Sequence, residues 1–175
     1  GLVHHDSRVE QHTARVACEA CHIPTFANTI PTKMRWDWSK AGDDSRKDDP
    51  HHYLKIKGEF VYGERLIPAY RWFDRRVGRY LLGDPIAEDG PTAINPPLAT
   101  RSTPGAKVWP FKVHQASQPF DAVHRRLVQP VTSGEGGYWH EFDWDAAIRL
   151  GAAVTGLDYG GSYGFAETEM VWPIE

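Results

Sequence analysis

Both cysteines of the 175-residue chain lie in one short segment, and this segment constrains the fold more than any other feature. It reads Cys18-Glu19-Ala20-Cys21-His22, which has the C-x-x-C-H spacing of a c-type haem attachment site. Residues three apart share one face of a helix, so both thiols can form thioethers with one haem while His22 binds the iron. We therefore predict one covalent haem c, attached to Cys18 and Cys21 and bound by His22.

The residues alone leave three other uses of this segment open. A zinc site would need further ligands, such as His22 and a remote histidine. A thioredoxin-like redox pair would need a strand before the cysteines and a long helix after them, whereas Pro24 ends the helix just past His22. A disulfide between residues three apart would close almost no loop and stabilise little. Haem attachment is the preferred interpretation.

Glycine and proline number 16 and 13, and they favour turns over long regular elements. We expect a mostly irregular fold with short α-helices and at least one β-hairpin, organised around the covalent haem. Residues 1–30 are the predicted haem-attachment segment, and residues 31–175 a loop-rich region that covers the haem, within one structural unit. The chain starts at Gly1 without a methionine or a signal-peptide pattern, so we expect a mature product or a piece of something longer.

Cap and turn signals place the individual elements. The expected helices and their start signals are 6–22 with Thr13 as N-cap, 67–82 from Pro68, 122–128 capped by Asp121, and the segment from Asp143 or Asp145 to Gly156. Alternation around Lys57-Gly58 predicts a hairpin over 53–62. We expect a loop over 83–105 and an extended tail over 160–175 that lies on another surface. Trp36-Asp37-Trp38 and Phe142-Asp143-Trp144 share a pattern that we interpret as a helix-start device.

Charge and hydropathy exclude several classes. The 20 Lys and Arg are mixed with 23 Asp and Glu for a net charge of −3, which gives no electrostatic case for nucleic acid. No apolar run approaches the roughly 20 residues of a transmembrane helix. The chain has no Ser-His-Asp series, phosphate-binding Gly-rich loop or paired-carboxylate signature, which excludes hydrolases and nucleotide enzymes.

The remaining eight histidines supply candidates for the second axial ligand. We prefer His114 because the rigid apolar segment before it can hold the ring, with a surface or outer-sphere histidine as the alternative. Methionine is scarce, and Met34 and Met170 are its two candidates for this ligand. His5 and His12 precede the motif so closely that we expect them to point toward a neighbouring haem as metal ligands.

Arginines are concentrated between residues 65 and 79. Guanidinium groups bind carboxylates bidentately, so Arg71 and Arg75 are candidates for contacts with haem propionates or an oxyanion. The alternative is a solvated helix face on which arginines pair with Glu64 and Asp74.

Most of the chain resembles the C-terminal part of the octahaem tetrathionate reductase family of multihaem cytochromes c. The matching pieces occur in the same order and are His12-Thr13, Val16-Ala17-Cys18-Glu19-Ala20-Cys21-His22-Ile23-Pro24, Trp36-Asp37-Trp38-Ser39, Ile67-Pro68-Ala69-Tyr70-Arg71-Trp72-Phe73, Trp109-Pro110-Phe111-Lys112-Val113-His114, Gln118-Pro119-Phe120-Asp121, Phe142-Asp143-Trp144 and Glu167-Thr168-Glu169-Met170-Val171-Trp172-Pro173-Ile174. The resemblance implies a multihaem cytochrome c-like fold, a periplasmic or extracellular location and a role for His12 as a haem ligand. The family's reductive centre, a haem with a lysine ligand, belongs to a part that this sequence lacks.

The leading functional hypothesis is a c-type cytochrome subunit or fragment that transfers electrons within a multihaem chain. Its expected partners are other multihaem cytochrome chains or haems of the same assembly, and redox partner proteins. The alternative is a module of an oxyanion reductase, of the tetrathionate, nitrite or hydroxylamine type, with a catalytic haem at or near this chain. A third hypothesis, a zinc or structural module without haem, requires the C-x-x-C-H spacing to be accidental.

Overall fold

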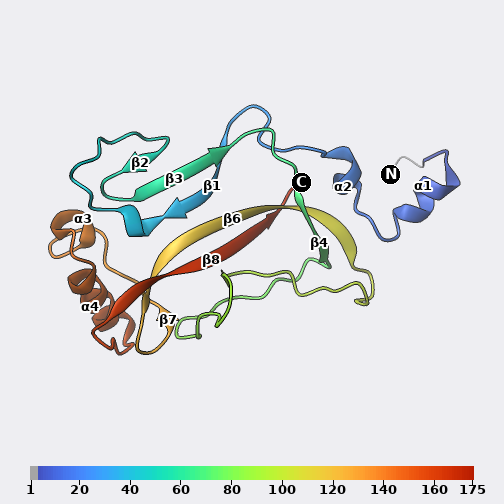
Figure 1. Cartoon of the computed structure of the whole chain (residues 1–175). Helices are drawn as coiled ribbons and strands as arrows, with labels where there is room; N and C mark the ends of the chain where they lie inside the picture. Colours follow the sequence, from blue (N-terminus) through green and yellow to red (C-terminus); the bar gives the residue numbers. More distant parts are fainter. Residues whose placement is uncertain (1–3) are drawn as a thin grey trace.

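The structure, a computed structural model, describes residues 4–175, so the first three residues of the predicted 1–30 segment lie outside it. Its central element is β6 (Lys107–Asp121), a strand of 15 residues. β8 (Tyr163–Pro173) runs antiparallel to β6 from Phe111 to Asp121. Figure 1 shows the two as long neighbouring strands that cross the molecule. This confirms the predicted extended tail, which pairs with the central strand β6.

Six shorter strands complete an eight-stranded sheet around this pair. β1 (Thr32–Asp37) lies parallel to β6, and β3 (Gly58–Gly63) lies antiparallel to β1. β2 (Tyr53–Leu54) closes the predicted hairpin with β3, which confirms it. The other three strands are β4 (Ala69–Phe73) and β7 (Arg126–Leu127), which pair with opposite ends of β6, and β5 (Thr92–Ala93), which pairs with β8. The chain thus has more strand than the sequence analysis expected.

The helices are short, as predicted. They are α1 (Ser7–His12), α2 (Cys18–His22), the 3-10 helix η1 (Trp38–Lys40), α3 (Tyr138–Glu141) and α4 (Trp144–Thr155). In the part of the chain that the structure covers, residues 4–175, no helix has the length and apolar character needed to cross a bilayer.

The shared aromatic-Asp-Trp pattern does start a helix at both of its occurrences. The Asp143 carboxylate accepts a hydrogen bond from the Ala146 amide at 3.1 Å, and Gly156 ends α4 with a left-handed φ of 72°. Asp37 caps η1 in the same way through the Ser39 amide at 3.0 Å. The predicted cap at Thr13 is wrong, because Asp6 caps α1 and Thr13 follows its last residue.

Two predicted helices are replaced by strand and turn. Within 67–82, residues Ala69–Phe73 pair with β6 as β4, because the backbone amides of that segment find partners across the sheet. Asp121 does not cap a helix over 122–128, since it is the last residue of β6. Its carboxylate instead accepts the amides of Val123 and His124 at 2.8 and 3.1 Å and closes a turn that leads into β7.

The apolar side chains gather in two clusters at opposite ends of β6. The first contains Ala17, Phe73, Trp109, Phe111 and Val171 and lies beside α2. The second contains Tyr138, Trp144, Ala147 and Ile148 and packs α3 and α4 against the sheet. Figure 1 shows α2 near one end of β6 and the α3–α4 pair near the other. The first cluster therefore supports the C-x-x-C-H segment.

The buried carboxylate of Asp121 makes the stability of the fold depend on acid pH. Burial alone would raise the pKa of Asp121, but hydrogen bonds from the His124 ring and from the amides of Gly160, His124 and Val123 hold this pKa at about 2. The folded pKa is depressed, so the associated stability is present above pH 4 or so and is lost as the pH falls toward 2.

Replacing the carboxylate by an amide tests this interaction. We expect Asp121→Asn to lower the free energy of unfolding at pH 7 by about 2 kcal/mol, since each pKa unit corresponds to about 1.4 kcal/mol. The difference between the two proteins should shrink between about pH 4 and pH 2. Chemical denaturation at several pH values measures it. An unchanged difference at low pH would contradict the assignment.

Candidate haem attachment site

The C-x-x-C-H segment folds as a single helical turn tied to the central strand. The Ala17 amide donates to the Val108 carbonyl at 3.0 Å, and the Val108 amide donates to the Arg15 carbonyl at 2.8 Å. These two bonds fix the start of α2, which has no side-chain cap. The helix ends at His22, as Pro24 predicts. Both thiols are free and exposed on this turn, so they are accessible for thioether formation.

The structure places a second imidazole next to His22, and it belongs to His4. The centres of the two rings are 6.3 Å apart and their planes differ by 27°. Two imidazoles that bind one metal from opposite sides, each with a bond of about 2 Å, have ring centres about 6 Å apart. The distance between the ring centres of His4 and His22 is therefore close to that of two imidazoles on one iron, with the two rings stacked in this structure.

The Nδ1 atom of His4 lies beside Glu10. This atom is buried and makes no hydrogen bond within residues 4–175. Glu10 Oε2 lies 3.5 Å from Nδ1, which is long for a hydrogen bond, and accepts from the His4 amide at 3.2 Å. The sequence analysis considered His5 and His12 but missed His4, although all three precede the motif closely.

An open cleft of about 620 Å³ borders Cys18. Its lining includes Ala17, Phe73 and Trp109 of the first apolar cluster. The charged residues of the lining are Arg75, Arg76 and Lys107, with Glu19 and Asp74 of opposite charge. Arg75 has a left-handed φ of 69°, a conformation that costs free energy outside glycine. The cleft thus joins an apolar floor to charged side chains, among which Arg75 and Lys107 form no ion pair within residues 4–175 and suit carboxylates.

The predicted arginine group is divided because its segment is a strand and turn instead of a helix. Arg75 lines the cleft beside Cys18, whereas Arg71 is exposed on β4 and donates to the Tyr70 carbonyl at 3.3 Å. Arg76 forms an ion pair of 2.6 Å with Asp74. The alternative in the sequence analysis, in which arginines of this group pair with Glu64 and Asp74, expected such a pair.

His114 lies on β6, between β1 and β8, with its ring half-buried. Its Nδ1 faces the Lys33 carbonyl at 3.2 Å, and its ring meets the edge of Trp172 at 6.0 Å between centres. Burial lowers the pKa of His114, the hydrogen bond to Lys33 raises it in part, and the charges of Lys112 and Lys33 lower it again. The ring is therefore neutral at pH 7, and Nδ1 is the protonated nitrogen that donates to Lys33.

The other two predicted metal ligands are at the surface. His5 precedes α1 and His12 ends it, and both side chains are exposed. A zinc site needs a gathered set of ligands. Within residues 4–175, no three His, Cys, Asp or Glu side chains form such a group.

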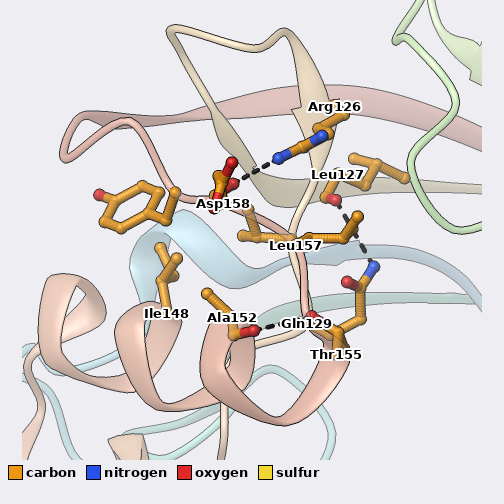
Figure 2. A pocket seen from close by; sticks show the side chains of 10 residues that line it. Arg126, Leu127, Gln129, Ile148, Ala152, Thr155, Leu157 and Asp158 are labelled. Atoms are coloured by element: carbon orange, nitrogen blue, oxygen red, sulfur yellow. Dashed lines mark hydrogen bonds between the residues drawn. The ribbon is translucent and has the colours of Figure 1, made fainter.

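A separate pocket between β7 and α4 is too small for a cofactor. Figure 2 shows its lining, which includes Leu127, Ile148 and Leu157. Its volume is about 10 Å³, which is room for no more than about one water molecule. This small void lies beside the second apolar cluster. Because it has no room for a cofactor, the region around Cys18 is the better candidate for a ligand site.

Comparisons with known proteins bear on the same region. A family model described as Cytochrome c bacterial matches residues 33–175. The crystal structure of octaheme cytochrome c from Shewanella oneidensis is 41% identical to this chain, with a TM-score of 0.90. The match covers 98% of this chain and 42% of that chain. No curated protein sequence matches.

The fold and the C-x-x-C-H helix define a c-type cytochrome, a class whose covalent haem transfers electrons. By the extent of the family match, the chain belongs to the bacterial cytochrome c family. It spans 42% of the octahaem protein that it resembles in structure, so it corresponds to part of a multihaem chain. The narrower resemblance to tetrathionate reductases stays a prediction.

Proposed function

We propose that the chain is an electron-transfer module with one covalent haem c, attached to Cys18 and Cys21 and bound by the imidazoles of His22 and His4. The observation that carries the proposal is the 6.3 Å spacing of the two rings beside two exposed thiols. When bound, the haem supplies a one-electron redox centre. With His22 and His4 both bound to the iron, no ligand position would remain for a substrate, which favours electron transfer over catalysis.

The other predicted ligands then serve neighbouring haems. His5 and His12 are exposed on the α1 side of the motif, and His114 is neutral with its Nδ1 hydrogen bonded to a carbonyl. That hydrogen bond is the one that metal-bound histidines usually make, and it leaves Nε2 for a metal. The proposed partners are haems of a larger multihaem assembly and its redox partner proteins, in the periplasm or outside the cell.

Arg75 is proposed to neutralise haem carboxylates. Its place in the cleft beside Cys18 and its strained backbone support this role. Arg71 lies outside that cleft, so its predicted contact with a haem carboxylate would involve a neighbouring haem.

The axial assignment predicts a change of spin state in one variant and not in another. His4→Ala should convert a low-spin haem to high spin, because the iron loses one of two strong-field imidazoles. His114→Ala is the matched control and should leave the spectrum low-spin. Visible spectra of the oxidised and reduced chain, at equal haem content, measure both. The reverse pattern would replace His4 by His114 as the axial ligand.

Carbon monoxide separates electron transfer from the reductase alternative. We expect the reduced wild-type chain not to bind carbon monoxide, since both axial positions are filled, and His4→Ala to bind it readily. The difference spectrum with and without the gas reports binding. Ready binding by the wild-type chain would favour a catalytic haem, and absence of haem after expression with the attachment machinery would overturn both functions.

A further inference from the structure

A second open cavity, with a volume of about 690 Å³, is lined by Arg15, Trp72 and Arg101. It differs from the cleft beside Cys18 in its lining, because Trp72 and Phe73 are successive residues of β4 and point to opposite faces of the sheet. The proposed electron-transfer function uses none of these three residues. Two arginines and one aromatic ring line this cavity, and a lining of this charge favours a ligand of opposite charge.

The side chain of Arg15 is held in place before any ligand binds. Its guanidinium carbon lies 4.7 Å from the centre of the Trp72 ring, within the range of a cation–π contact. The guanidinium also donates a hydrogen bond to the Arg101 carbonyl. Its backbone is fixed as well, because the Arg15 carbonyl accepts the Val108 amide and the Arg15 amide donates to His12. Little side-chain entropy remains to be lost on binding.

The second arginine belongs to a turn that is braced by hydrogen bonds. The Thr100 amide donates to Thr103 Oγ1 at 2.9 Å, and the Thr103 amide donates to the Thr100 carbonyl at 3.1 Å. These contacts hold the backbone of Arg101, whose carbonyl also receives Arg15. The Arg15 guanidinium and the Arg101 backbone are therefore held together as one unit.

The positive charge of this unit is not neutralised by the chain. Among the ion pairs formed within residues 4–175, none involves Arg15 or Arg101. A guanidinium has five N–H donors, and the contact with the Arg101 carbonyl uses few of those of Arg15. Its planar fork matches the oxygens of carboxylates and oxyanions bidentately.

From this arrangement we propose that Arg15, Arg101 and Trp72 form a binding site for a small oxygen anion, of the carboxylate or tetrahedral oxyanion class. Arg15 stacks on Trp72 and presents its free N–H groups to the anion, and Arg101 adds the second charge. The site is a binding site separate from the haem ligands, and its existence does not depend on the axial assignment.

Titration of the haem-loaded chain with two probe anions tests the site. Sulfate represents the tetrahedral oxyanions and succinate the carboxylates, and calorimetry at constant ionic strength separates a specific site from screening. We expect saturable binding of one anion per chain by at least one probe. Preference for sulfate or for succinate identifies the class of the ligand.

Two variants and one control assign the binding to the cavity. Arg15→Gln and Arg101→Gln should each weaken binding about tenfold or more, because each removes charge-assisted hydrogen bonds. Arg15→Lys keeps the charge but loses the planar fork, so it should also bind more weakly than the wild type. Arg8→Gln, which removes an exposed arginine of α1 outside the cavity, should bind as the wild type does.

The outcomes are decisive in both directions. Weakening by both glutamine variants, with unchanged haem content and circular dichroism, supports the site. Absence of saturable binding of both probes, or wild-type affinity in either glutamine variant, would overturn it. Because the readout is anion binding, failure of this site leaves the low-spin spectrum of the proposed haem unaffected, and the two proposals are judged separately.

Discussion

The structure depends on a pair of backbone hydrogen bonds between the residues before Cys18 and the strand β6. The Val108 amide and carbonyl bind Arg15 and Ala17, so a helix of only five residues acquires a fixed position. Isolated helices of this length are unstable in water, and α2 has no side-chain cap. The attachment turn is therefore rigid because the sheet holds it, and the proposed ligand pair and both cavities lie around that contact.

This contact explains how the proposed haem site and the proposed anion site can lie close together in sequence and still differ in chemistry. Arg15 and Cys18 are three residues apart, on either side of the bridge to Val108. β4 continues the division, since its alternation sends Phe73 into the apolar cluster beside Cys18 and Trp72 toward Arg15. One strand thus supplies an apolar wall to one cavity and a cation–π platform to the other.

Signals in the local sequence predicted the elements whose stability depends on local interactions. The C-x-x-C-H turn, the hairpin around Gly58 and α4 all depend on spacing, turn residues or caps close by in the chain. β4 and β6 were missed because their stability comes from pairing between distant segments, and because Pro110 and Pro119 interrupt the pattern of β6. The tail that forms β8 was predicted to be extended, but its pairing with β6 was not. His4 was missed for the same reason, since its relation to His22 exists only once α1 and α2 are placed.

The link between Ala17 and Val108 also makes the attachment turn depend on a distant part of the chain. Its partner lies about 90 residues later, so the contact carries the entropic cost of closing the intervening loop. The residues from Cys18 to His22 therefore keep a fixed orientation only while strand β6 is in place, because α2 has no side-chain cap of its own. A substitution in β6 far from the motif in sequence would thus be felt at the two thiols.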